Sequence, residues 1–348
     1  MFVSLSKRFL LIFVSSTFVF FSSIGSVFAA VDGPKVEWDW SMWGKRRALT
    51  EHMEKMVETV AKETNGNFKI KIHYGGALSP AKENIDNVKL GSIHGALACA
   101  PYTPGKLPAS MVLSLPFLPI FTFEQMERVH NAVYAHPYIQ KELGRWRAKV
   151  IMTSLVPPYE LMGKGKPPLN IMTDWEGRRL RALGGMGDAM KRIGATPTSM
   201  PAPEVYTSLE RGLVDGVAFP NTYAFSAYRL HEISDWRTTN MSLGGLACPV
   251  VVNAKAWKAL PAQYQKLMLD SVRTSLDAQA ASYKETDDKN IPLFAEKGIV
   301  AITYPIADRN KFVEKAGRPV WDEWVKKASS KGIPAQELLD LVLKTAAM

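Results

Sequence analysis

The segment from Asp174 to Tyr223 constrains the fold more than any other, because strand and helix patterns alternate along it. Residues 178–183 are typical of a short strand, and a glycine-rich turn separates them from a helix predicted over 188–193, which Gly194 ends. After a second short helix, residues 214–219 return to a strand pattern. Strand–helix–strand order predicts a mostly parallel sheet and an α/β fold.

Arg181 stands at the carboxyl end of the first of these strands. Ligands of such sheets gather at the carboxyl ends of the strands. The guanidinium group keeps its charge and offers a planar fork that matches a carboxylate. The glycine turn behind it presents backbone N–H groups at a helix N-terminus, which also favours an anion. The residues therefore indicate a carboxylate site, with a surface ion pair of Arg181 as the open alternative.

Nucleotide binding and catalysis have weaker support. Gly185-Met186-Gly187 resembles the start of a dinucleotide fingerprint, but Met190 occupies the third glycine position and no acidic residue ends a following strand. The six histidines lack metal-ligand spacing, and no Gly-x-Ser-x-Gly elbow occurs. We therefore expect a binding protein, with no catalytic residues, no metal and no cofactor.

The N-terminus has the pattern of a secretory signal peptide over residues 1–29. Lys7 and Arg8 precede an apolar run over 9–21, and small residues before Ala29 suit cleavage there. A retained membrane anchor is the alternative, but a span needs about 20 apolar residues. We therefore expect export to the periplasm.

The chain is basic, with a formal net charge of +10, which falls by two if the signal peptide is removed. Its lysines and arginines are scattered rather than grouped in a block or interleaved with aromatic residues. This distribution is typical of a solvated surface, so we expect no nucleic-acid partner. The length allows two domains of ordinary size.

The chain has two cysteines, Cys99 and Cys248, each within an apolar run typical of a buried strand. A cysteine pair in an exported protein is a candidate disulfide. Two buried free thiols fit the same pattern equally well, so the sequence leaves both possibilities open.

Two further segments have structural signals. Residues 262–291 contain neither glycine nor proline and lie between Pro261 and Pro292. They predict one long helix, about 45 Å at 1.5 Å per residue. Near the N-terminus, Trp40 and Trp43 stand at the end of the first mature strand. Aromatic rings at a strand end can stack on a substrate, or simply fill the core.

The central segment resembles the substrate-binding proteins of TRAP transporters, the DctP-like periplasmic binders. The resemblance rests on ordered motifs and extends over nearly the whole mature chain. The motifs are Asp174-Trp175-Glu176-Gly177, Leu180-Arg181, Gly194-Ala195-Thr196-Pro197, Met200-Pro201, Glu204-Val205-Tyr206, Leu213-Val214-Asp215-Gly216, Gly76-Ala77-Leu78-Ser79-Pro80 and Leu115-Pro116-Phe117-Leu118-Pro119.

The resemblance implies a two-lobed periplasmic binding protein fold, with a cleft between the lobes and a long helix that spans both. Lobe I would comprise residues 30–157 and 247–290, and lobe II residues 158–246 and 291–348. In this family the arginine that matches Arg181 holds the substrate carboxylate. The partners would be a small-molecule carboxylate and the membrane permease of a TRAP transporter.

Seven other residues are expected in the cleft on this basis: Phe219, Tyr159, Trp40, Trp43, Tyr102, Gly76 and Asn221. Sialic-acid-binding members have a second arginine where spacing places Leu161, and an asparagine where it places Phe219, with Asn221 two residues later. The second polar clamp is thus replaced by apolar surface. We expect a monocarboxylate with an apolar or aromatic body. A C4-dicarboxylate binder of the same family and a binder for an ATP-driven importer are the alternatives.

Overall fold

The computed structural model describes Met1 and residues 30–348, so the predicted signal peptide lies outside the described residues. One of its two sheets has the strand order β2-β1-β3-β10-β4. In this sheet β1 is parallel to β2 and β3, whereas β10 is antiparallel to β3 and β4. Its strands are β1 (Val36–Ser41), β2 (Phe68–His73), β3 (Gly95–Leu97), β4 (Ala148–Met152) and β10 (Val250–Asn253).

The other sheet has the order β11-β9-β5-β8-β6-β7. Strand β6 is parallel to β7 and β8, as the strand–helix–strand pattern predicts, while β5 is antiparallel to β8 and β9. Its strands are β5 (Tyr159–Gly163), β6 (Arg179–Arg181), β7 (Thr196–Thr198), β8 (Gly216–Pro220), β9 (Trp236–Thr238) and β11 (Val300–Ile302). The sheet therefore places Arg181, the last residue of β6, beside Val217 of β8.

Helices cover both sheets. The helices around the first sheet are α1 (Glu51–Glu63), α2 (Asn84–Leu90), α3 (Phe123–Ala135), α4 (Pro137–Arg145), α8 (Ala254–Ala259) and α9 (Ala262–Asp270). Those around the second are α5 (Gly184–Lys191), α6 (Val205–Glu210), α7 (Tyr223–Ala227), α11 (Ile306–Phe312) and α12 (Arg318–Ser329). The last helix, α13 (Ala335–Ala346), packs against α3. None of the described helices has both the length and the apolar character that a membrane span needs.

We call the first sheet with its helices the first lobe and the second sheet with its helices the second lobe. The chain passes between them over residues 153–158 and 239–249, and these two segments pair side by side. The Tyr159 amide donates to the Gly244 carbonyl at 2.8 Å, and the Leu243 amide donates to the Tyr159 carbonyl at 2.9 Å. The residue boundaries proposed for the lobes from the sequence stay a prediction.

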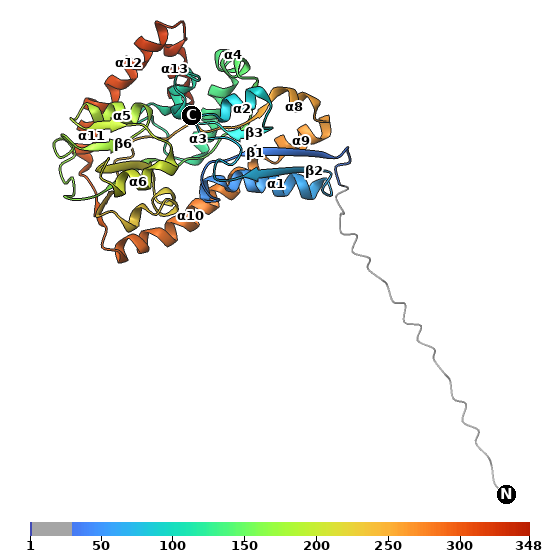
Figure 1. Cartoon of the computed structure of the whole chain (residues 1–348), viewed down its shortest axis with the longest axis horizontal. Coiled ribbons are helices and arrows are strands. Elements are labelled where there is room, and N and C mark those ends of the chain that lie inside the picture. The colour runs from blue at the N-terminus through green and yellow to red at the C-terminus, as the bar shows by residue number, and fades with distance from the viewer. Residues whose placement is uncertain (2–29) are drawn as a thin grey trace. The chain divides into compact units, whose positions relative to one another are not determined.

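A long helix spans both lobes, as predicted, but its bounds differ from the expected ones. The helix α10 (Val272–Glu296) contacts α1 of the first lobe and α7 of the second (Figure 1). It is separated from α9 by Ser271 and continues through Pro292. The helical stretch expected over 262–291 therefore starts where predicted but is interrupted at Ser271 and continues to Glu296. Beyond Pro292 the helix is held by tertiary packing, because the buried Phe294 ring contacts Phe225 of α7.

The helix after Arg181 also begins earlier than predicted. The sequence suggested a glycine turn and then a helix from Asp188, but α5 starts at Gly184 and includes Gly185 and Gly187. At Gly185 a Cβ atom would lie 2.5 Å from Pro116 of the first lobe. This glycine therefore serves close packing between the lobes rather than a turn.

Two buried histidines contact the first crossing segment and predict acid sensitivity. His52 Nε2 lies 2.8 Å from Ser154 Oγ, and His130 Nδ1 lies 2.6 Å from Thr153 Oγ1. Burial lowers the pKa of His52 from 6.5 to about 3 and that of His130 to about 4. The two histidines therefore bind protons more tightly in the unfolded chain than in the folded protein. Their contribution to stability is fully present above pH 6.5 and is lost as the pH falls toward their folded-state pKa values. We expect urea denaturation to show about 2 kcal/mol lower stability at pH 5.5 than at pH 7 from this pair.

A double variant isolates this contribution. His52→Gln with His130→Gln removes both titrating rings, while the buried carboxyls of Glu142 and Glu160, whose pKa values are raised by burial, titrate in both proteins. The difference in unfolding free energy between wild type and variant should shift by about 2 kcal/mol over the same pH range. A difference that stays constant with pH would contradict the assignment.

Candidate functional site

The side chain of Arg181, the last residue of β6, is completely buried. Its Nε and Nη2 atoms donate to the Met200 carbonyl at 3.2 and 3.0 Å, and Nη1 donates to the Ala218 carbonyl at 2.8 Å. The guanidinium carbon lies 4.5 Å from the centre of the Phe219 ring. These neighbours fix the orientation of the guanidinium without supplying a negative charge.

Arg181 has no carboxylate partner among the described residues. Their ion pairs involve other arginines, such as Arg46, Arg179 and Arg192. The alternative of a surface ion pair is therefore wrong for Arg181. A buried charge without a counter-ion costs several kcal/mol. Three of its five N–H groups are used, which leaves one on each terminal nitrogen. Two parallel N–H groups are what a bidentate pair with a carboxylate requires.

Four of the predicted aromatic residues surround one small cavity beside this arginine: Trp43, Tyr102, Tyr159 and Phe219. The Arg181 guanidinium stacks on the ring of Phe219, one of these four residues. Tyr102 of the first lobe accepts a hydrogen bond from the Ala202 amide of the second at 3.3 Å. The cavity volume is about 20 Å³, room for about one water molecule. An organic acid can therefore enter only when these walls move apart.

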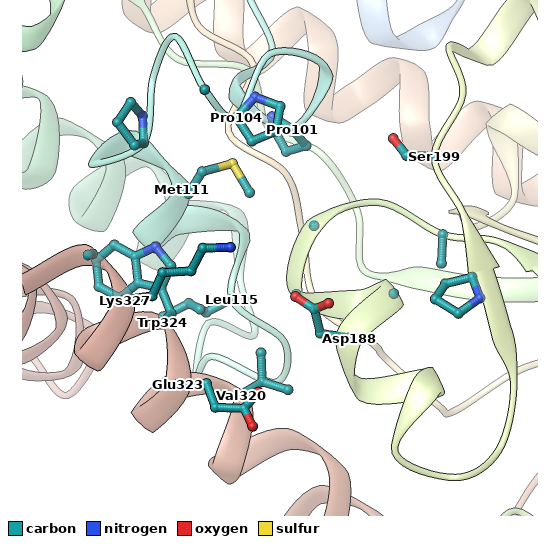
Figure 2. Close-up of a pocket in the computed structure, with 18 of the residues that line it drawn as sticks. Pro101, Pro104, Met111, Leu115, Asp188, Ser199, Val320, Glu323, Trp324 and Lys327 are labelled. Atoms are coloured by element: carbon teal, nitrogen blue, oxygen red, sulfur yellow. The ribbon is translucent and has the colours of Figure 1, made fainter. Parts of the chain in front are cut away.

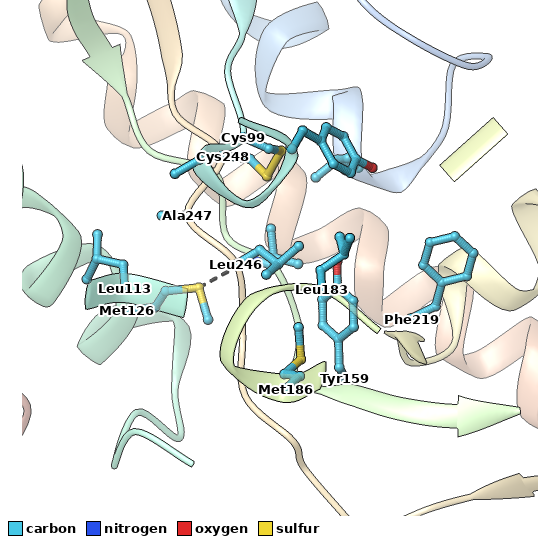
Figure 3. Close-up of a cluster of buried hydrophobic side chains, with 14 of the residues drawn as sticks. Cys99, Leu113, Met126, Tyr159, Leu183, Met186, Phe219, Leu246, Ala247 and Cys248 are labelled. Carbon is cyan, nitrogen blue, oxygen red and sulfur yellow. Dashed lines mark hydrogen bonds between the residues drawn. A yellow bond between two sulfur atoms is a disulfide. The ribbon is translucent and has the colours of Figure 1, made fainter. Parts of the chain in front are cut away.

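A disulfide between Cys99 and Cys248 forms part of the same wall. Figure 3 shows it next to the apolar cluster that contains Leu246 and Tyr159. The bridge joins the residues that follow β3 and precede β10, which are antiparallel neighbours in the first sheet. Of the two possibilities that the sequence left open, the structure has the disulfide.

Buried tyrosine hydroxyls add hydrogen-bond donors to the site. Burial raises the pKa of Tyr159, Tyr223 and Tyr228. The nearby positive charges, Arg181 for Tyr159 and mainly Arg47 for Tyr223 and Tyr228, only partly oppose this shift. The three hydroxyls therefore stay protonated at physiological pH. A protonated hydroxyl can donate to a carboxylate or to another oxygen acceptor.

Arg181 itself is not among the residues that line this cavity, and neither are three of the seven others predicted for the cleft. Trp40 is buried in the first sheet, where a Cβ atom on Gly95 would lie 2.7 Å from its indole nitrogen. Gly76 lies in the turn after β2, and its amide donates to the Met42 carbonyl at 3.0 Å. Asn221 follows β8, and its amide donates to the Pro158 carbonyl at 3.3 Å.

Arg47, Tyr223 and Tyr228 line the cavity but were missed from the sequence. Arg47 ends a run of three basic residues, Lys45-Arg46-Arg47, which reads as a solvated loop. The first two are exposed, whereas the third turns inward. No sequence signal distinguishes the inward arginine, because only tertiary packing sets its direction. Tyr223 is the first residue of α7 and Tyr228 directly follows this helix, which the sequence did not predict near the site.

A larger groove of about 650 Å³ lies between the two lobes and includes Ala182, the residue after Arg181 (Figure 2). It is lined by prolines of the first lobe, including Pro101 and Pro104, by the start of α5 and by α12. Asp188 points toward it, and burial together with Glu323 raises the pKa of the Asp188 carboxyl. The groove contains none of the side chains predicted for the cleft and no buried arginine, although Gly184, Gly185 and Gly187, from the turn expected to favour an anion, line it.

The model of one protein family, DctP, described as "Bacterial extracellular solute-binding protein, family 7", matches residues 41–328. The chain is 24% identical over 290 residues to the C4-dicarboxylate-binding periplasmic protein DctP of Rhodobacter capsulatus, which covers 81% of this chain and 84% of that protein. It is also 24% identical over 315 residues to a monocarboxylate 2-oxoacid-binding periplasmic protein of Nostoc sp., with 84% of each chain covered.

Solved structures have the same fold. A TRAP solute-binding protein from Rhodoferax ferrireducens, in complex with copurified benzoate, gives a TM-score of 0.79 at 20% identity and covers 90% of this chain and 98% of that chain. A marine metagenome TRAP solute-binding protein specific for aromatic acid ligands, in complex with 3-hydroxybenzoate, gives a TM-score of 0.78 at 21% identity. It covers 90% of this chain and 99% of that chain. The predicted two-lobed fold is therefore confirmed.

These matches also confirm the prediction of a substrate-binding protein rather than an enzyme, because the relatives and the similar structures are named for the solutes they bind. The predicted resemblance to DctP-like binding proteins is confirmed by the family model. The family model matches well over half of the 348 residues. The chain belongs to the DctP family of bacterial extracellular solute-binding proteins.

Proposed function

We propose that this protein captures a monocarboxylate with an apolar or aromatic body in the periplasm and delivers it to the membrane permease of a TRAP transporter. The observation that carries the proposal is the buried Arg181 guanidinium, which has two unused N–H groups and no carboxylate partner among the described residues. A ligand carboxylate would neutralise it, and a charge-assisted bidentate pair stabilises by about 1.5–3 kcal/mol.

The apolar walls support a ligand with an apolar body. Leu161, at the position where spacing would put a second arginine of sialic-acid-binding members, is a buried residue of β5. Phe219 replaces the asparagine of those members and faces the cavity beside Tyr159. Burial of an apolar ligand surface would contribute roughly 25 cal/mol per Å². Benzoate and 2-oxo acids, named for similar proteins, are ligands of this type.

The capture mechanism would be opening and closing of the two lobes. The small volume of the cavity and the Tyr102–Ala202 hydrogen bond between the lobes fit a closed form. The paired crossing segments and α10 would act as the hinge. The closed, loaded form would then be the one that the permease recognises.

The disulfide supports export of the protein. Disulfides persist in oxidising compartments such as the periplasm and are rare in the cytosol. The Cys99–Cys248 bridge therefore agrees with the signal peptide predicted over residues 1–29 and with cleavage near Ala29. The names of the relatives, which are periplasmic proteins, support the same location.

Isothermal titration calorimetry tests the proposed ligand class. The protein is first unfolded, dialysed and refolded, so that any ligand from the cells is removed. We expect phenylpyruvate to bind at least about tenfold more tightly than succinate, because the second carboxylate of succinate would lose its hydration against apolar walls, at about 1–3 kcal/mol. Tighter binding of succinate would favour the C4-dicarboxylate alternative and reject the aromatic one.

A further inference from the structure

A second arginine faces the cavity from the first lobe. Arg47 lies between β1 and α1, and its Nη1 atom donates to the carbonyls of Trp43 at 3.1 Å and Lys45 at 2.7 Å. Its Nε and Nη2 atoms are buried and have no hydrogen-bond partner among the described residues. No ion pair of the described residues involves it either, in contrast to its neighbour Arg46, which pairs with Glu51 at 2.8 Å.

An aromatic pair lies between the two arginines. The rings of Phe219 and Tyr228 stack with their centres 5.2 Å apart and an angle of 15° between their planes. Arg181 contacts the Phe219 ring at 4.5 Å, and Arg47 contacts the Tyr228 ring at 5.5 Å. The site therefore has a cation at each end of an apolar, aromatic surface, one from each lobe.

The backbone near Arg47 is suited to this contact. Gly44 has a φ of +67°, which a residue with a side chain rarely adopts. A Cβ atom there would lie 3.1 Å from the Tyr228 hydroxyl and 3.2 Å from Nη1 of Arg47. Glycine at this position thus allows the arginine and the tyrosine of the other lobe to approach each other.

We infer that Arg47 binds a second oxygen acceptor of the ligand, at the end away from the carboxylate on Arg181. This inference rests on the proposed function and narrows the ligand class to aromatic or apolar acids that carry a hydroxyl or oxo group on the body. Buried N–H groups without a partner are costly, so a ligand that supplies an acceptor gains over one that does not. A neutral acceptor suffices, because the partly exposed Arg47 side chain keeps contact with solvent, unlike Arg181.

Paired ligands that differ by one hydroxyl test the inference. Calorimetry with benzoate, 3-hydroxybenzoate and 4-hydroxybenzoate gives the preference of the wild type for the hydroxylated acids. We expect at least one of these to bind about tenfold more tightly than benzoate. In Arg47→Met this preference should fall to less than about twofold, while the affinity for benzoate changes by less than about threefold. The matched control is Arg46→Met, which removes the exposed neighbouring arginine and should keep the preference.

The outcomes separate this inference from the proposed function. An unchanged preference in Arg47→Met, or an equal loss for all three acids, overturns the role of Arg47 and leaves the proposed function intact. Failure of the wild type to bind any of the acids counts against the proposed function itself, and the inference falls with it. If Arg47→Met does not fold, as judged by thermal denaturation, Arg47→Leu decides. It also removes every side-chain N–H donor, so a preference within about twofold of wild type overturns the inference.

Discussion

Replacing Arg181 with methionine should reduce the affinity for the acid ligand by at least about 30-fold. The methionine side chain fills similar space but leaves the ligand carboxylate buried without its partner, which costs about 2–5 kcal/mol. The loss should be common to all acids, because Arg181 contacts the group that they share. Calorimetry with phenylpyruvate on wild type and Arg181→Met measures it directly.

The neighbouring strand residue Arg179 provides the control. It is exposed and pairs with Asp215 at 2.6 Å, so Arg179→Met should keep the affinity and change stability little. Arg181→Met should fold as well, because it removes an unpaired buried cation although it leaves the Met200 and Ala218 carbonyls without a donor. If folded Arg181→Met binds as tightly as wild type, the carboxylate is held by another residue.

The sequence predicted much of the second lobe because its signals are local. Alternating apolar residues and helix-ending glycines located β6, α5 and β8 to within a few residues. The errors arose where tertiary contacts decide. Gly185 serves close packing on Pro116 of the other lobe, and Pro292 is tolerated because Phe294 packs beyond it. The two-lobed arrangement itself followed from the family resemblance and not from residue periodicity.

Part of the candidate site was also predicted because its sequence signals are local. Arg181 could be singled out because a strand end and a glycine-rich turn mark its position in the sequence. Tyr159 and Phe219 lie on neighbouring strands β5 and β8, in adjacent residue pairs (Tyr159 with Pro220, Glu160 with Phe219), so their proximity follows from the sheet. The Trp40 side chain is buried in the first sheet and does not line the cavity. The residue type alone does not reveal this difference. Arg47 is one of three consecutive basic residues, and its inward direction depends on the fold of the loop around Gly44.

Loss of the disulfide should have the largest effect on stability. Cys99 and Cys248 are separated by 149 residues, so the bridge closes a long loop that holds both crossing segments and most of the second sheet. In the chain-entropy account, a closed loop of this length restricts the unfolded state by about 5 kcal/mol, and native bridges typically contribute 2–5 kcal/mol. We expect the double variant Cys99→Ala with Cys248→Ala to lose about 3–5 kcal/mol of unfolding free energy in guanidinium titrations.

Alanine is the suitable replacement because both cysteines are buried, at 5% and 3% exposure, and serine would bury a hydroxyl without a partner. Reductant separates the bridge from the cavity that the substitution creates. Dithiothreitol should destabilise the wild type nearly as much as the double substitution does, and it should leave the double variant unchanged. A loss below about 1 kcal/mol in both experiments would mean that the sheet contacts between β3 and β10 hold these segments without the bridge.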